Sequence, residues 1–199
     1  MQNENEIAPF RIVTIGDGSV GKTSIIVRLV ENRFNAYEAA TIGANFQTYI
    51  QIVEGIKIEM QIWDTAGQEK FKSLNTAYYR NAAAAIAVFS LTSRDTFTNL
   101  SKEIETFYSV AGPNAIVFAS ANKSDLSDEF EVQIKEAKEW AKTRGFHLYF
   151  TSAKTGDNIP LLFNDLSLEL YKIYQSKFTA SFQQNKSLVP IAEVKKGCC

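Results

Sequence analysis

Hydrophobic and polar residues alternate most regularly along the segment IKIEMQIW, residues 56–63. Every second residue from Ile56 to Ile62 is apolar and polar residues lie between them, which is the pattern of a half-buried β-strand. The segment FQTYIQIV, residues 46–53, precedes it, and only Glu54 and Gly55 connect the two. The two segments therefore predict an antiparallel β-hairpin.

The other strand candidates are short, largely apolar runs, which suit strands buried on both faces by helices. They span residues 10–15, 84–89, 115–121 and 147–151. Between them, apolar residues recur every three or four positions, the period of an amphipathic helix. Two such series are Phe130, Ile134, Ala137 and Ala141, and Leu162, Leu166, Leu170 and Ile173. The alternation predicts an α/β fold, with a mostly parallel six-stranded sheet, one antiparallel edge hairpin and helices on both faces.

The periodic pattern stops near Lys177, and Pro190 interrupts the mixed residues that follow. We therefore expect one globular domain over residues 8–176 and a flexible, hypervariable C-terminal tail over residues 177–199. A length of 199 residues suits one domain with a short appendage.

Composition excludes several classes of function. The formal net charge is −1, so the chain has no overall basic field to hold nucleic acid. The longest apolar run, residues 82–89, is too short to cross a bilayer, and the first ten residues lack the features of a signal peptide. The only cysteines are Cys198 and Cys199, which excludes a disulfide framework and favours the reducing cytosol. Because His147 is the only histidine, we expect a plain strand or surface residue there rather than a zinc ligand or a catalytic base.

The segment GDGSVGKT, residues 16–23, fits the phosphate-binding pattern G-x-x-x-x-G-K-[ST] between a strand and a helix. Its glycines let backbone N–H groups converge on phosphate oxygens beside the positive end of the helix. Lys22 is predicted to contact the β- and γ-phosphates, and the Thr23 hydroxyl to bind Mg²⁺. A plain glycine turn would match by chance in about one chain in a hundred of this size. The residues of this phosphate-binding loop are Gly16, Asp17, Gly18, Ser19, Val20, Gly21, Lys22, Thr23 and Ser24.

The segment NKSD, which comprises Asn122, Lys123, Ser124 and Asp125, follows an apolar strand. Ligands bind at the carboxyl ends of strands in open α/β sheets. The carboxylate of Asp125 can accept the two N–H groups of guanine, whereas adenine has no proton on N1 and leaves the charge unpaired. The segment TSAKT ends the next strand, where its residues Ser152, Ala153 and Lys154 are placed to close the base pocket. Alone, NKSD is a routine polar turn, but after a phosphate-binding loop it predicts guanine recognition.

These motifs together resemble those of the Ras-related small GTPases over about residues 10–174. The most telling stretch is WDTAGQEKF, residues 63–71. The resemblance implies that Asp64 supports Mg²⁺, partly through water, that the Gly67 amide contacts the γ-phosphate, and that Gln68 orients the attacking water. It also implies that Thr41 binds Mg²⁺ and the γ-phosphate, and that Phe34 packs against the guanine.

The same resemblance implies a switch that cycles between GTP and GDP. Thr41 and Gly67 hold the γ-phosphate while it is present, so two loops order with GTP and relax with GDP. Gly18 and Gln68 match hydrolysis-competent members, and we expect slow hydrolysis until an activating protein supplies an arginine.

Within that group the chain resembles a Rab protein and is expected to act as a monomer in vesicle trafficking. IGANF is similar to the Rab segment IGVDF, with Ala44 and Asn45 as departures, and MQIWDTAGQE and KFKSLNTAYYRNA are similar to two further Rab signatures. Ser90 and Ala121 also depart from the usual Asp and Gly. The implied effector contacts are Ile42, Gly43, Phe46, Trp63 and Tyr78; simple hairpin core is the alternative for the three aromatic residues. The implied regulators are an exchange factor, a GTPase-activating protein and a GDP-dissociation inhibitor or escort protein.

The adjacent thiols at the C-terminus also fit this resemblance. A disulfide between neighbouring residues is strained, because their Cα atoms are only about 3.8 Å apart. Many Rab proteins end in Cys-Cys, so Cys198 and Cys199 are predicted to carry geranylgeranyl groups. Two lipid chains give stable anchoring, and Lys195 and Lys196 add attraction to anionic lipid. The protein is then expected in the cytosol when escorted and on the cytoplasmic face of intracellular membranes, including endosomes, when anchored.

Three rival classes share part of this pattern. A P-loop ATPase or small-molecule kinase is disfavoured by NKSD and SAK. A membrane scaffold that binds GTP without cycling is disfavoured by Gly18 and Gln68. A Ras-type or Rho-type signalling switch is disfavoured by the Cys-Cys end, and no Rho-style insert follows NKSD.

Overall fold

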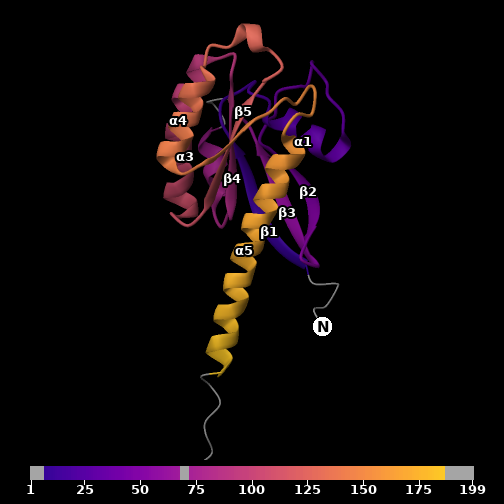
Figure 1. Cartoon of the computed structure of the whole chain (residues 1–199), viewed down its shortest axis with the longest axis vertical. Helices are drawn as coiled ribbons and strands as arrows, with labels where there is room; N and C mark the ends of the chain where they lie inside the picture. Colours follow the sequence, from indigo (N-terminus) through magenta and orange to yellow (C-terminus); the bar gives the residue numbers. More distant parts are fainter. Residues whose placement is uncertain (1–6, 68–71, 187–199) are drawn as a thin grey trace, which may run out of the picture.

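The computed structural model describes residues 7–67 and 72–186. Strands and helices alternate along the chain, as the sequence predicts (Figure 1). In order, the elements are β1 (Ile7–Ile15), α1 (Lys22–Glu31), β2 (Ala44–Val53), β3 (Ile56–Thr65), α2 (Lys72–Tyr79), β4 (Ala84–Ser90), α3 (Arg94–Ala111), β5 (Ile116–Asn122), the 3₁₀ helix η2 (Ser127–Glu129), α4 (Ile134–Arg144), β6 (His147–Phe150) and α5 (Ile159–Lys186).

The six strands form one sheet in the order β2-β3-β1-β4-β5-β6. Only β2 and β3 pair antiparallel, and every other pair is parallel, so the predicted fold class is confirmed.

Glu54 and Gly55 connect β2 to β3 with φ values of 49° and 79°. Positive φ at both central residues is the geometry of a tight hairpin turn, and glycine reaches it without strain.

Helices cover both faces of the sheet and bury two apolar clusters. On one face, α1 and α5 pack over inward side chains of β1 and β3, including Ile12, Ile58 and Met60. On the other face, α2, α3 and α4 pack over the side chains of β4 and β5, including Phe89 and Ala121. Every residue of β4 is buried, as its continuous apolar run predicts.

Helix α5 is longer than the sequence pattern indicates. The apolar period ends near residue 176, the predicted domain boundary, but the helix continues to Lys186 and extends past the end of the sheet (Figure 1). Residues 177–186 contain no Gly or Pro, and adding residues to an existing helix is much easier than starting one. No helix within the described ranges is long and apolar enough to span a membrane.

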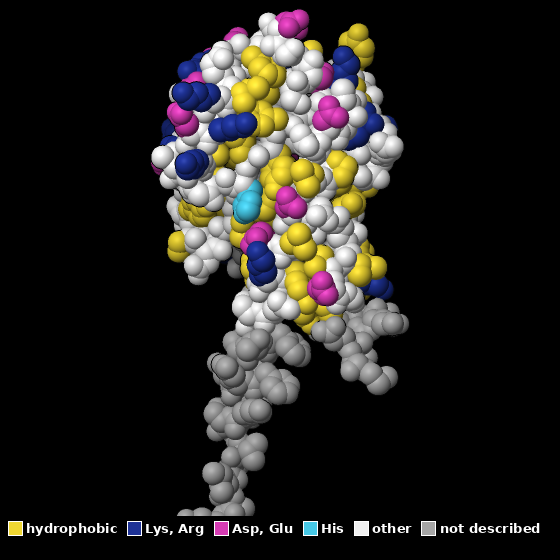
Figure 2. All heavy atoms as spheres, viewed as in Figure 1, with side chains coloured by type: hydrophobic (Ala, Val, Ile, Leu, Met, Phe, Trp, Pro, Cys, Tyr) yellow, Lys and Arg dark blue, Asp and Glu magenta, His cyan; other side chains and the backbone are white. Residues whose placement is uncertain are grey.

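Acidic and basic side chains are interspersed on the face shown in Figure 2, so this face has no extended basic field. His147 lies exposed at the start of β6, with its ring stacked on Phe118 at 4.6 Å between centroids. It is a surface residue at a strand end, as predicted.

The loops that carry the predicted motifs follow the carboxyl ends of β1, β3, β5 and β6. Because β1, β3, β4, β5 and β6 run parallel, these ends meet at one edge of the sheet. At this edge a Cβ on Gly16 would lie 2.1 Å from the Val88 carbonyl oxygen, so only glycine fits where the first loop leaves β1.

Candidate functional site

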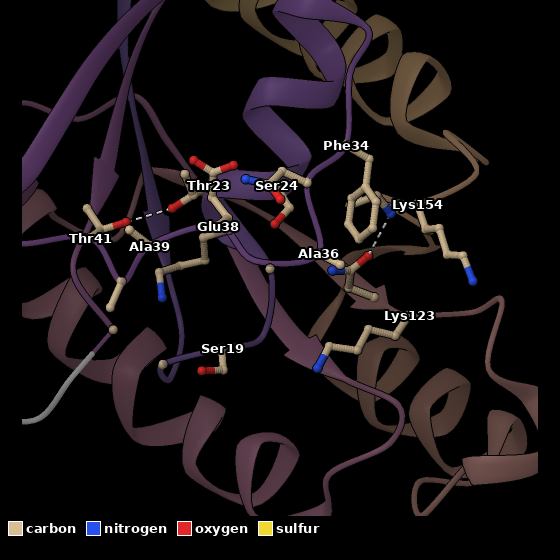
Figure 3. Close-up of a pocket in the computed structure, with 18 of the residues that line it drawn as sticks. Ser19, Thr23, Ser24, Phe34, Ala36, Glu38, Ala39, Thr41, Lys123 and Lys154 are labelled. Atoms are coloured by element: carbon tan, nitrogen blue, oxygen red, sulfur yellow. Dashed lines mark hydrogen bonds between the residues drawn. The ribbon is translucent and has the colours of Figure 1, made fainter.

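A pocket of about 520 Å³ opens at the carboxyl edge of the sheet (Figure 3). The structure brings together there the following predicted residues: Gly18, Ser19, Gly21, Lys22, Thr23, Ser24, Phe34, Thr41, Gly67, Asn122, Lys123, Asp125, Ala153 and Lys154. Figure 3 shows Thr23 and Thr41 at one end of the pocket and Phe34, Lys123 and Lys154 at the other. We call these the phosphate end and the base end.

The loop 16–21 wraps around the amino end of α1 at the phosphate end. Gly21 precedes the helix with a φ of 98°, and a Cβ there would lie 2.3 Å from Asn122 Nδ2. Lys22, only 6% exposed, donates hydrogen bonds of 2.8 Å to the carbonyls of Gly16 and Asp17. The buried ammonium and the helix terminus together form a positive environment suited to phosphate.

Three oxygen-bearing side chains from three segments converge beside Lys22. The Thr23 hydroxyl lies 2.7 Å from the Thr41 hydroxyl and donates to Asp64 Oδ2 at 2.6 Å. Thr41 also donates to the same carboxylate oxygen at 3.4 Å. A carboxylate and two hydroxyls are oxygen ligands of the kind that Mg²⁺ takes, and Mg²⁺ commonly uses only one or two carboxylates. In the part of the chain that the structure describes, no three His, Cys, Asp or Glu side chains gather to offer a different metal centre.

The Asp64 carboxylate is 2% exposed, and this burial raises its pKa. Hydrogen bonds from Thr23, Thr14 and Thr41 and the charge of Lys22 offset part of the increase. The folded pKa therefore lies above the unfolded one. The contribution of Asp64 to the free energy of unfolding is fully present below the unfolded pKa and is lost as the pH rises through the folded pKa. A bound cation would compensate this charge, and protons would compete with the cation as the pH falls.

Because burial of the ionised Asp64 carboxylate outweighs its hydrogen bonds and the charge of Lys22, we predict that Asp64→Asn will stabilise the nucleotide-free protein at high pH. We expect its melting temperature in EDTA to rise by about 3 °C near pH 8, the equivalent of about 1 kcal/mol, because the amide carries no buried charge. Thermal unfolding at several pH values measures this, and the gain should shrink as the pH falls. Asp128→Asn, a substitution at an exposed residue of η2, is the control. It should leave the melting temperature unchanged at every pH. A loss of stability in Asp64→Asn near pH 8 would contradict the expectation.

Thr14 belongs to the site but the sequence did not reveal it. Its hydroxyl donates to Asp64 Oδ1 at 3.1 Å and accepts the Thr65 N–H at 3.2 Å. The Thr14 hydroxyl thereby holds the Asp64 carboxylate, near the end of β3, against β1. The only signal was a threonine at a buried position of an apolar strand.

At the base end, Asp125 accepts a hydrogen bond of 2.6 Å from Ser152, and its Oδ2 lies 4.0 Å from Lys154 Nζ. Asn122 connects the two other loops that meet at this end of the pocket. Its Nδ2 donates to the Val20 carbonyl at 2.8 Å, and its Oδ1 accepts the Ala153 N–H at 3.2 Å. The NKSD segment, the segment 151–155 and the phosphate-binding loop are thus held as one unit.

Gly67 approaches the phosphate-binding loop closely. A Cβ on Gly67 would lie 2.3 Å from Lys22 Nζ and 2.4 Å from the Asp17 carbonyl oxygen, so no larger residue fits. The preceding Ala66 N–H donates to the Gly43 carbonyl at 2.9 Å, which links the segments that carry Gly67 and Thr41.

The predicted catalytic Gln68 lies outside the described residues, as do Cys198 and Cys199.

The three aromatic residues of the predicted effector surface form one cluster beside these segments, in which Tyr78 stacks on Trp63 and Phe46 meets Trp63 edge to face. Trp63 lies between Phe46 and Tyr78, with ring centroids 5.3 and 5.1 Å away. Phe46 is 47% exposed, so the cluster reaches the surface there, while Trp63 and Tyr78 also pack against the core. Ile42, four residues before Phe46, is 78% exposed.

Some residues that line the pocket belong to none of the predicted motifs. They are Asn35, Ala36, Glu38, Ala39, Ala40 and Leu126. Most belong to the irregular segment between α1 and β2, where neither periodicity nor charge distinguishes a wall of a pocket from any other loop. Ser90, a departure from the family pattern, is buried and bonds to Thr92 at 2.9 Å, and it does not line the pocket.

Comparison with known proteins agrees with the geometry. The family model described as Ras family matches residues 11–172. Ras-related protein RABA4b of Arabidopsis thaliana is 38% identical over 172 residues, which cover 86% of this chain and 77% of that protein. Ras-related protein Rab11C of Nicotiana tabacum is 35% identical over 96% of this chain and 92% of its own length, and Ras-related protein Rab-5A of Dictyostelium discoideum is 34% identical over 99% and 95%. The chain therefore belongs to the Rab family of Ras-related small GTPases, enzymes that hydrolyse GTP.

Proposed function

We propose that this GTPase is a membrane-anchored switch, which recruits effectors for vesicle trafficking while it holds GTP. The observation that carries the proposal is the meeting of two surface segments at the phosphate end of the pocket. Thr41 comes from the first switch segment, residues 33–43, and Gly67 from the segment that follows β3. A γ-phosphate bound by both would tether both, and its loss would release them.

In this proposal, guanine nucleotide binds along the pocket with its base between Phe34 and the Lys123 and Lys154 stems. Asp125 accepts the two N–H groups of guanine, and Ser152 fixes that carboxylate. Lys22 and the backbone N–H groups of the phosphate-binding loop bind the β- and γ-phosphates. Mg²⁺, when bound, is held by Thr23, Thr41 and Asp64 and supplies charge neutralisation to the phosphates.

Hydrolysis in this proposal is slow unless a partner assists. Gln68 orients the attacking water, which is a positioning role that needs only one hydrogen-bonding side chain. Among the described residues that line the pocket are three lysines, Lys22, Lys123 and Lys154, but no arginine. The charge that develops on the transferred phosphoryl group is therefore best stabilised by an arginine from a GTPase-activating protein.

A single-turnover assay of the Mg²⁺-GTP complex tests this role. Gln68→Leu should slow hydrolysis roughly 10- to 100-fold, since the attacking water loses its orientation. The affinity for GTP should change little, because Gln68 is assigned no part in binding. Gln133→Leu, at the residue before α4, is the matched control. Equal hydrolysis rates in the Gln68 variant and the wild type would remove Gln68 from the mechanism.

The remaining parts of the proposal concern partners and place. Effectors contact Ile42 and Gly43 and the aromatic cluster of Phe46, Trp63 and Tyr78, which adjoins the first switch segment and so can report the nucleotide state. An exchange factor and an activating protein set that state. The tail carries geranylgeranyl groups on Cys198 and Cys199, and a GDP-dissociation inhibitor or escort protein holds them in the cytosol. The anchored protein then lies on the cytoplasmic face of intracellular membranes, including endosomes.

A further inference from the structure

Arg28 makes an unusual set of bonds on the far side of the base end. It lies in the last turn of α1, and its guanidinium bonds both the base loop, residues 151–155, and Asn32, which caps the same helix. Nε donates to the Ala153 carbonyl at 2.9 Å, and Nη2 donates to the Lys154 carbonyl at 2.7 Å. Nη1 donates to the carbonyl and to the side-chain Oδ1 of Asn32 at 3.0 and 3.2 Å. One side chain thus connects the base loop, residues 151–155, to the end of α1.

Both connected segments lead directly into walls of the base end. Ala153 and Lys154 line the pocket, and the Ala153 N–H is bonded to Asn122, which also bonds the phosphate-binding loop. On the other side, Asn32 has a φ of 50° and ends α1, and the first switch segment begins at the next residue. Phe34 is two residues beyond Asn32 and lines the same end. A base held there would touch both segments that Arg28 joins.

We propose that Arg28 is a positioning residue that couples the base loop to the first switch segment and thereby slows the release of bound guanine nucleotide. The inference rests on the proposed function, because it presumes that the base occupies this end of the pocket. Release requires the Phe34 wall and the base loop to part. While Arg28 bonds both, neither segment moves independently of the other.

The geometry requires arginine and not simply a positive charge. The planar guanidinium directs Nε and Nη2 to two successive carbonyls and Nη1 to Asn32, whereas an ammonium is a single point charge on a flexible stem. Lysine would keep the favourable charge at the carboxyl end of α1 but could not hold both segments at once. Arg28→Lys therefore separates a coupling role from a general contribution to helix stability.

The test measures release of a fluorescent GDP analogue from the full chain, in Mg²⁺ with excess unlabelled GDP. Arg28→Gln and Arg28→Lys should each release it about 10-fold faster, the size expected when one or two charge-assisted hydrogen bonds are lost. Arg94→Lys is the matched control. That arginine is half exposed and pairs with Glu136 at 2.6 Å, away from the pocket, so release should stay at the wild-type rate.

Hydrogen exchange on the GDP-bound proteins supplies a readout that a merely structural role would not move. In Arg28→Lys, exchange should rise in peptides covering residues 31–36 and 151–157 together, and stay unchanged in β4 and α3. Wild-type release in Arg28→Lys, or faster exchange in only one of the two segments, would overturn the coupling. If the wild type failed to retain guanine nucleotide at all, the proposed function itself would be wrong, which is a different result.

Discussion

Asp125→Asn should lower the affinity for GDP roughly 10³- to 10⁴-fold, because a site built to pair with substrate N–H groups rejects a mismatch strongly. The asparagine amide would present a donor to the N2 amine of guanine. The variant should instead gain affinity for xanthosine diphosphate, in which a carbonyl replaces that amine and can accept from the new amide. Competition binding with the two diphosphates measures both changes.

The variant should fold normally, since the Ser152 hydroxyl can still donate to the remaining side-chain oxygen at position 125. Asp157→Asn provides the control, because Asp157 lies just beyond the base loop and is not among the residues that line the pocket. It should leave both affinities unchanged. Loss of GDP binding without any gain for xanthosine diphosphate would mean that Asp125 holds the loop but does not read the base.

Removing both terminal thiols should abolish membrane attachment of the protein in cells. Cys198→Ser with Cys199→Ser leaves no acceptor for a lipid, and the two lysines near the end add only about 1 kcal/mol each. We expect the membrane-bound fraction to fall at least 100-fold, measured by fractionation and by imaging of an N-terminally tagged chain.

The single variants provide the graded control. One lipid chain binds reversibly, so Cys198→Ser and Cys199→Ser should each give an intermediate fraction that exchanges with the cytosol. Nucleotide binding should be identical in all four proteins, since the pocket is lined by loops at the carboxyl edge of the sheet, and α5 ends beyond the opposite edge (Figure 1). Full attachment of the double variant would show that another surface anchors the chain.

Sequence periodicity predicted the sheet because each strand meets a simple environment. β3 has a helix-covered face and a more open face and alternates from Ile56 to Ile62, whereas β4 is buried along its whole length and is apolar up to its last residue, Ser90. The first strand was predicted from Phe10, yet it begins at Ile7 and includes Pro9. Proline is tolerated there because β4 pairs with β1 only from Ile12 onward, so the missing N–H at Pro9 disrupts no bond on that side.

The motif residues were predictable because phosphate, metal and base each demand particular groups at fixed positions along the chain. Thr14, Arg28 and the wall formed by residues 35–40 escaped detection for the opposite reason. Thr14 and Arg28 act through residues distant in the sequence, at separations of 50 and about 125 positions, so no local pattern marks them. The length of α5 was not predicted because the sequence of its last turns shows no apolar period.

The central claim is that the pocket senses the γ-phosphate and transmits its presence to two surface segments. Hydrogen exchange of the full chain, loaded with GDP or with a non-hydrolysable GTP analogue in Mg²⁺, tests it most directly. Residues 33–43 and 66–72 should exchange more slowly with the triphosphate, while α3 and β4 exchange equally in both states. Equal exchange of the two segments with either nucleotide would contradict the account.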